Sequence, residues 1–233
     1  MNRSRASCAA LTVAVAVLAA CAGSGAPLPG GASSEPSPSN AGRTGGDTVD
    51  AALVPPGFGT LRQDDISVRL QYQGVSVRIL PLEESVIRLL SSDSYRALHE
   101  LKESRRAEAE AIARRANLSR YSLWYVSFFG MQQGEARYSP NEVVIENLGR
   151  EYRPADVIPL TQGFGDQRLR QRETQSAVYV FDGSLDLAQP LTVRVETEQS
   201  TSWAGTARVI ERERALVRSR AGAPSAQPAT PPR

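Results

Sequence analysis

The sequence predicts a mainly β protein built as an antiparallel β-sandwich with a helical insertion. Apolar and polar residues alternate with a period of two in several short runs, which is typical of half-buried strands. Residues that favour turns, namely Gly, Pro, Asn and Asp, end each run. One stretch with helical spacing interrupts the strands. Runs of strands, rather than alternating strands and helices, favour a sandwich.

The first two strands are expected to form a hairpin. Apolar residues alternate with polar ones from Ile66 to Tyr72, and the same alternation resumes from Val75 to Ile79. Gln73-Gly74 lies between the two runs, and a two-residue connection ending in Gly is a hairpin signal.

The stretch Tyr121 to Gly130, YSLWYVSFFG, is apolar on both faces, so this strand requires cover on both sides. A helix from Ser94 to Asn117 is a candidate cover, and Asp93 is expected to cap its start. Its apolar side chains recur at helical spacing: Tyr95, Leu98, Leu101, Ala109, Ile112 and Ala116.

Three further strands are predicted around Val143 to Ile145, Ala177 to Phe181 and Leu191 to Val195, because alternation returns there. A second helix is predicted from Thr206 to Ser219. The alternative is that Arg208 to Ile210 finishes the sheet and the remainder frays.

The composition divides the chain into four parts. Residues 1–20 are expected to be a signal peptide and residues 21–60, rich in Gly, Ser, Pro and Ala, a disordered tether. Residues 61–219 form the predicted sandwich domain, with the helical insertion at about residues 83–117. Residues 220–233 are expected to be a disordered tail.

The first twenty residues have the layout of an export signal. Arg3 and Arg5 precede an apolar stretch from Leu11 to Leu18, and small residues follow it. The apolar stretch is about half as long as a helix that crosses the hydrocarbon core must be. We therefore expect export and no permanent membrane span.

Leu18-Ala19-Ala20-Cys21 resembles the lipobox of bacterial lipoproteins. The resemblance implies lipid attachment at Cys21 through diacylglycerol and further acyl chains such as palmitate, with cleavage just before this residue. Several chains on one cysteine hold a protein firmly to the bilayer, whereas one chain does not. Ala22 stands where an inner-membrane retention signal has Asp, which favours an outer-membrane protein facing the periplasm, with the cell surface as the alternative. An ordinary signal peptide with an incidental cysteine is the competing interpretation.

Cysteine and charge counts exclude several functions. Cys8 leaves with the signal and Cys21 is acylated, so the mature domain has no thiol for a disulfide, a metal site or a nucleophile. Loss of Arg3 and Arg5 from the 27 basic residues leaves as many basic residues as the 25 acidic ones. A neutral chain is not steered towards nucleic acid.

Three segments carry a resemblance to a family: ENLGREYRPADVIPL, RLRQRETQSAVYVF and QPLTVRVE. In this order they are similar to the immunoglobulin-like domains of uncharacterised bacterial lipoproteins. The resemblance implies an immunoglobulin-like sandwich. It implies no catalytic or binding residues, because the family has none assigned.

No set of catalytic or metal-binding residues is predicted. His99 is the only histidine, and it cannot supply a zinc cage alone. The pairs Asp64-Asp65 and Glu83-Glu84 are adjacent in sequence, so their side chains point in different directions on a strand or a helix. Gly163 to Asp166 lacks the Lys-Ser/Thr of a phosphate loop and is expected to be a turn. We expect no enzyme activity, no cofactor and no metal.

The segment from Gln167 to Arg172 places Arg168, Arg170 and Arg172 at alternate positions. On a strand these three guanidinium groups lie along one face. They either protect an edge strand against unwanted pairing, or bind anionic groups such as lipopolysaccharide phosphate or an acidic partner.

The leading hypothesis is a non-enzymatic, lipid-anchored protein of the cell envelope whose sandwich binds another protein or an envelope component. The alternative is a glycan-binding module or cell-wall hydrolase with Trp124, Tyr125 or Trp203 as a stacking platform. That alternative requires exposed rings, whereas Trp124 is predicted to be buried.

Overall fold

The computed structural model describes residues 53–165 and 167–222. The predicted signal peptide, Cys21, the tether up to residue 52, Asp166 and residues 223–233 lie outside the described residues. The described part is mainly β, with antiparallel sheets and a few helices, and is consistent with a β-sandwich. Within it, no helix has both the length and the apolar character that a membrane crossing requires.

The strands form two sheets and a small ribbon. The larger sheet has the order β1 (Val68–Tyr72), β2 (Val75–Pro81), β3 (Tyr121–Gly130), β9 (Thr174–Asp182) and β7 (Asp156–Pro159). The smaller sheet has the order β11 (Glu198–Ser200), β10 (Leu191–Val195), β5 (Val143–Asn147) and β6 (Arg150–Tyr152). A two-stranded ribbon pairs β4 (Glu135–Arg137) with β8 (Arg168–Arg170).

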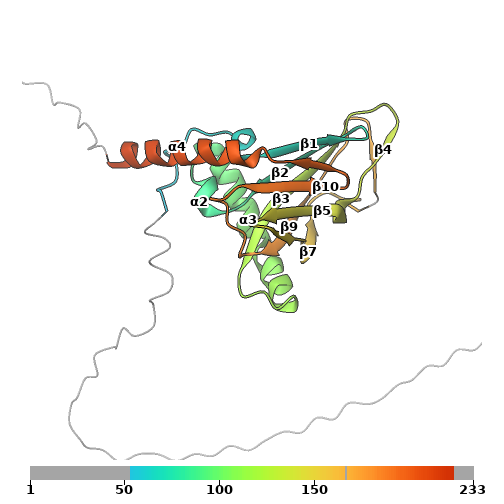
Figure 1. Cartoon of the computed structure of the whole chain (residues 1–233), viewed down its shortest axis with the longest axis horizontal. Helices are drawn as coiled ribbons and strands as arrows, with labels where there is room; N and C mark the ends of the chain where they lie inside the picture. Colours follow the sequence, from blue (N-terminus) through green and yellow to red (C-terminus); the bar gives the residue numbers. More distant parts are fainter. Residues whose placement is uncertain (1–52, 166, 223–233) are drawn as a thin grey trace, which may run out of the picture. The chain divides into compact units, whose positions relative to one another are not determined.

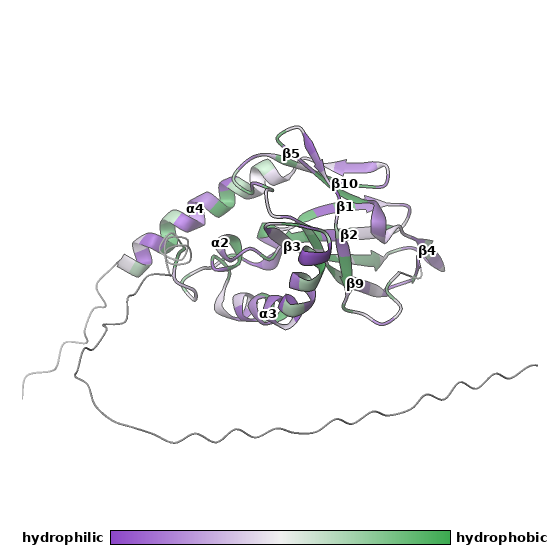
Figure 2. Ribbon diagram, turned by 90° about the horizontal axis from the view of Figure 1, so that it is seen from below, coloured by the Kyte–Doolittle hydropathy of each residue, from purple (hydrophilic) through white to green (hydrophobic). Residues whose placement is uncertain are grey.

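The described residues also form five helical segments. Two are short 3-10 turns, and the others are a single α-turn and two long helices. They are η1 (Gln63–Ile66), α2 (Glu84–Ile87), α3 (Ser92–Arg115), η2 (Pro140–Glu142) and α4 (Trp203–Gly222). Figure 2 shows β5 and β10 on one side of the larger sheet and α3 on the other. The larger sheet is therefore the middle layer.

The first hairpin is confirmed. Strands β1 and β2 pair from Val68↔Ile79 to Tyr72↔Val75, with Gln73 and Gly74 as the two-residue turn (Figure 1). Both turn residues have positive φ, 42° for Gln73 and 78° for Gly74, which is the geometry of the primed turns that match the twist of paired strands. Alternate residues of β1 are buried, as the period of two predicts.

Strand β3 is confirmed as a strand that is buried on both faces. It pairs with β2 on one side and β9 on the other, so it occupies the centre of the larger sheet. Trp124 is fully buried, as predicted. Leu123, on the opposite face, is also buried and lines a small hollow together with Lys102, Glu103 and Arg106 of α3.

The long helix is confirmed, but the predicted N-cap and the predicted burial of Ala116 were wrong. The N-cap is Ser91, and Asp93 lies in the first turn, where its negative charge still favours the helix start. Ala116 is the exposed C-cap rather than part of the buried face. Asn117 follows in the left-handed conformation, with φ of 54°, which ends the helix.

The C-terminal helix α4 is also confirmed, and the alternative of a closing strand at Arg208 to Ile210 was wrong. Its first residue, Trp203, is fully buried and its ring lies 6.0 Å from the ring of Trp124. The indole N–H of Trp203 donates to the carbonyl of Leu187 at 3.0 Å. This contact fixes α4 to the core on the β3 face that the smaller sheet covers.

Contacts of the domain begin before the boundary predicted at residue 61. Val54 is buried, and Thr60 donates two hydrogen bonds to Oε1 of Glu213, from its N–H and from its hydroxyl, both at 2.9 Å. Arg220 binds the same carboxylate at 2.9 Å and the carbonyl of Phe58 at 2.8 Å. Helix α4 therefore holds the segment through which the chain enters the domain.

Gly59 allows the entry segment to pass close to the backbone of Leu89. A Cβ at this position would lie 2.1 Å from the backbone carbonyl of Leu89, while Gly205 in α4 has open space around it. Gly59→Ala should lower the free energy of unfolding by about 2 kcal/mol or more, because backbone must shift. Gly205→Ala should raise it by about 0.5–1 kcal/mol. Urea denaturation measures both, and equal effects of the two variants would contradict the close approach.

Candidate functional site

The predicted arginine row lies on the ribbon formed by β4 and β8. Leu169 and Ala136 are buried on its inner face, while Arg168 and Arg170 are exposed on its outer face. The prediction was wrong for Arg172, which follows the strand in a turn with a left-handed φ of 62°. Its side chain nevertheless lines the same hollow as the other two.

The ribbon adds an arginine that the sequence did not reveal. Arg137 pairs directly with Arg168, and Glu135 pairs directly with Arg170. Paired residues of antiparallel strands share a face, so Arg137 and Glu135 lie on the outer face too. We call Arg137, Arg168, Arg170 and Arg172 the arginine ribbon.

Three of these arginines, Arg168, Arg170 and Arg172, border an open hollow of about 530 Å³. It is lined by Glu135, Arg168, Arg170, Gln171, Arg172, Glu173 and Gln175. Glu173 accepts from the N–H of Arg170 at 2.8 Å and from the side chain of Gln175 at 3.0 Å. These hydrogen bonds lower the pKa of Glu173, and its carboxylate is therefore bound to groups within the domain.

The base of the ribbon is fixed to the larger sheet. The N–H of Arg172 donates to the carbonyl of Gly130 at 2.8 Å, and the N–H of Gly130 donates to Glu173 at 3.0 Å. A Cβ at Gly130 would lie 2.2 Å from the carbonyl of Arg170, so only glycine permits this approach. Figures 1 and 2 both show β4 at the end of the strands away from α4.

One edge of the larger sheet is closed to strand addition. In β7 the N–H of Val157 is taken by Oδ1 of Asp156 at 2.8 Å, and Pro159 has no N–H. Oδ2 of Asp156 is held by Arg115 of α3 at 2.5 Å. Proline and charged side chains commonly prevent an edge strand from pairing with another chain. A partner would therefore contact side chains of the domain and would not add a strand at β7.

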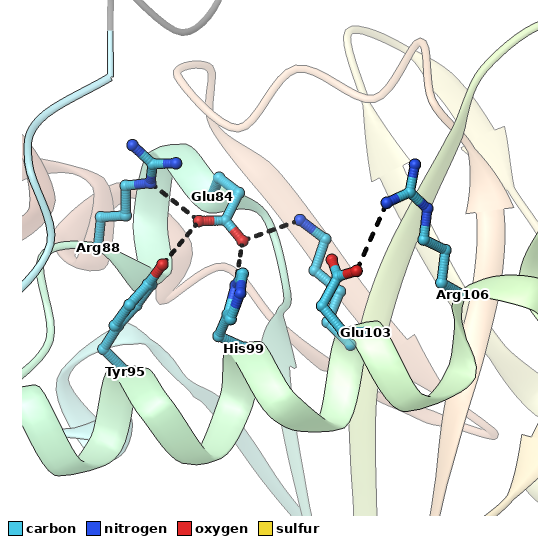
Figure 3. A network of polar contacts seen from close by, with 7 residues as sticks. Glu84, Arg88, Tyr95, His99, Glu103 and Arg106 are labelled. Atoms are coloured by element: carbon cyan, nitrogen blue, oxygen red, sulfur yellow. Dashed lines mark hydrogen bonds and ion pairs between the residues drawn. The ribbon is translucent and has the colours of Figure 1, made fainter.

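A second polar cluster centres on Glu84, the first residue of α2 (Figure 3). Its carboxylate lies 2.9 Å from Nε of Arg88, 3.0 Å from Nδ1 of His99 and 3.0 Å from Nζ of Lys102. The rings of Tyr95 and His99 stack beside it, with centroids 5.3 Å apart. The cluster joins α2 to α3.

The Glu84 cluster is a structural ion network. Burial alone would raise the pKa of Glu84, but hydrogen bonds from Arg88, His99 and Lys102 outweigh this effect and lower the pKa to about 2. A carboxylate with so low a pKa is a poor general base. The side chain of His99 is 40% exposed, which agrees with the expectation of a partly exposed helical histidine.

The other groups considered in the sequence do not converge on a catalytic centre. Asp64 is paired with Arg69 at 2.6 Å and with Arg78 at 3.3 Å. Glu83 precedes α2 as its N-cap, and Gly163 to Gly165 form a turn as predicted. Across residues 53–165 and 167–222, no group of His, Cys, Asp and Glu side chains is arranged to hold a metal ion.

The aromatic platform of the glycan hypothesis is not supported for the two tryptophans. Trp124 and Trp203 are both fully buried, so neither ring can stack on a sugar. Tyr125 is partly exposed, but the guanidinium of Arg78 lies over its ring, 5.9 Å from the centroid.

Two further hollows have mixed linings. One, of about 460 Å³, lies between α2, α4 and the loop at 183–188, and the bond from Arg214 to the carbonyl of Ser85, 3.1 Å long, ties α4 to α2 beside it. The other, of about 470 Å³, lies beside β7 and η2. Neither brings together as many cations as the hollow beside the arginine ribbon.

Comparisons with known proteins show no family for this chain. No protein-family model matches it, and no curated protein matches its sequence. Among solved structures, a functionally unknown protein from Listeria monocytogenes EGD-e is similar to 63% of this chain and 78% of that chain, at 10% sequence identity and a TM-score of 0.29.

The Glu84 cluster gives a prediction on pH dependence. A pKa lowered from 4.5 to about 2 stabilises the fold above pH 4.5, and this contribution is lost as pH falls from 4.5 towards 2. Glu84→Gln should therefore lower the free energy of unfolding by about 2 kcal/mol near neutral pH, and by little at a pH of about 2.

Chemical denaturation at both pH values measures the difference. Glu103→Gln is the matched control, because Glu103 lies on α3 next to Lys102, is 42% exposed and pairs only at 3.5 Å with Arg106. Its loss should change stability by less than about 0.5 kcal/mol. A pH-independent effect of Glu84→Gln would contradict the network.

Proposed function

We propose that the protein is a non-enzymatic, lipid-anchored component of the cell envelope that binds an anionic partner, either a protein or an envelope component, through the arginine ribbon. Lipid attachment at Cys21 and export are proposed from the sequence of the first 21 residues. The outer membrane, with the domain facing the periplasm, is the proposed location.

The observation that carries the proposal is the concentration of arginine on the ribbon. Among the described residues, the guanidinium groups of Arg137, Arg170 and Arg172 have no carboxylate partner within 4 Å, and Arg168 has only Glu135 at 3.7 Å. Elsewhere in the described residues, Asp64, Glu84, Asp182 and Glu213 are paired with arginine at 3.3 Å or less. Guanidinium groups left with spare donors are suited to carboxylate or phosphate.

The position of the ribbon also supports a binding role. The chain enters the domain beside α4, and the ribbon lies at the other end of the strands (Figure 1). Within the described domain, the ribbon and the entry segment therefore lie at opposite ends (Figure 1).

An immunoglobulin-like form of the sandwich is part of the proposal. Its supports are the two antiparallel sheets and the order of strand, Gly turn and strand in β5 and β6. Helix α3 would then be an insertion into that framework between β2 and β3.

Substitution of three arginines tests the proposed function. The triple variant Arg168→Ala, Arg170→Ala and Arg172→Ala should weaken partner binding by at least about a hundredfold, because three charge-assisted contacts are lost. Cross-linking in intact cells, followed by mass spectrometry of the captured components, measures the loss.

The control is a triple alanine variant of Arg114, Arg208 and Arg212, which are exposed on α3 and α4 and remove the same charge. It should capture the same components as the unaltered protein. If the ribbon variant also captured them in equal amount, the ribbon would not be the binding surface.

A further inference from the structure

We propose that Arg137 and Arg168 together form a binding site for a phosphate monoester, a proposal that rests on the proposed function and names the chemistry of its ligand. The pair lies on the outer face of the ribbon, across the two strands. Neither strand alone contains this site.

Hydrogen bonds at both ends of the ribbon establish how close the two arginines are. The N–H of Gln171 donates to Gly134 at 3.2 Å, and the N–H of Tyr138 donates to Gln167 at 3.3 Å. Hydrogen-bonded and non-hydrogen-bonded pairs alternate along antiparallel strands. Arg137 and Arg168 are therefore a non-hydrogen-bonded pair, the type with Cα atoms only about 4.5 Å apart.

Two like charges in this position destabilise the free protein. Like charges directly opposite each other on paired strands are unfavourable, whereas opposite charges stabilise. The only carboxylate on the six residues of the two strands, Glu135, is directly opposite Arg170 and lies 3.7 Å from Arg168. Arg137 has no carboxylate partner among the described residues. An anion between the two guanidinium groups removes the repulsion.

A phosphate monoester matches this charge better than a carboxylate does. It carries close to two negative charges near neutral pH and has three acceptor oxygens, and arginine binds such groups in bidentate fashion. A carboxylate carries one charge, and an acidic peptide spreads its charges along the chain. The hollow of about 530 Å³ beside Arg168 has room for the group that the phosphate is attached to.

The backbone that carries the pair is fixed before any ligand arrives. Leu169 and Ala136 are buried beneath it, and the backbone of Arg172 is bonded to Gly130. A site whose backbone is fixed in advance loses less entropy on binding.

Titration of the full-length protein, purified in a non-ionic detergent, with inorganic phosphate tests the site. Arg137→Gln and Arg168→Gln should each weaken binding about tenfold, because one charge-assisted contact is lost. The double control Arg208→Gln and Arg212→Gln removes twice the charge from α4 and should change affinity by less than about twofold. Glu135→Gln should tighten binding, because it removes the competing carboxylate.

The pH dependence identifies the ligand class. The second pKa of a phosphate monoester is about 6, so affinity should fall as pH drops through this value. Binding of a poly-glutamate peptide should be weaker and should not change there, because its carboxylates titrate near a pH of about 4. Micelles containing phosphatidic acid, compared with free phosphate, show whether the phosphate must belong to a lipid.

The outcomes separate this site from the proposed function. Unchanged phosphate binding by Arg137→Gln, or tighter binding of poly-glutamate than of phosphate, overturns the phosphate site and leaves an acidic partner for the ribbon. Loss of stability in Arg137→Gln without ligand also overturns it, because relief of repulsion should leave the thermal midpoint equal or higher. If the triple alanine variant still captures every partner, both proposals fall.

Discussion

The burial of strand β3 on both faces is the constraint on which the rest of the structure depends. Its apolar residues alternate between the two sides, so one layer of cover is not sufficient. Trp203 of α4 packs near Trp124 on the side of the smaller sheet, and α3 lies on the other side of the sheet, where Leu123 lines a hollow with Lys102 and Arg106 (Figure 2). Because hydrophobic burial is the main favourable term in folding, the three layers follow from this one strand.

The sequence was sufficient for elements whose signal is local. The hairpin at Gln73-Gly74, the two-faced strand and the long helix each have a pattern within a short window, and each was found at or near its predicted place. The residue at which the long helix starts was harder to predict. Ser91 and Asp93 are both residues that cap helices, and only the backbone geometry shows that the helix already begins at Ser92.

Contacts between distant segments were not accessible from the sequence. Arg137 lies in a strand of three residues, which is too short to show alternation, and its importance comes from pairing with Arg168. The role of Glu84 also depends on distant residues. Its carboxylate contacts His99 and Lys102 of α3, and these contacts could not be predicted from its position next to Glu83. Lipid attachment at Cys21 is the reverse case, since it rests on sequence alone and stays a prediction.

The distribution of charge sets the ribbon arginines, for which we propose a binding role, apart from arginines that join two elements of the domain. Arg220 joins α4 to the entry segment through Glu213, whose carboxylate lies 2.9 Å away, so its charge is compensated. On the ribbon, Arg137 opposes another arginine instead. Structural needs explain the first arrangement and not the second, because Leu169 and Ala136 already hold the ribbon to the core. An uncompensated pair that adds nothing to folding is best explained by a ligand that supplies the missing negative charge.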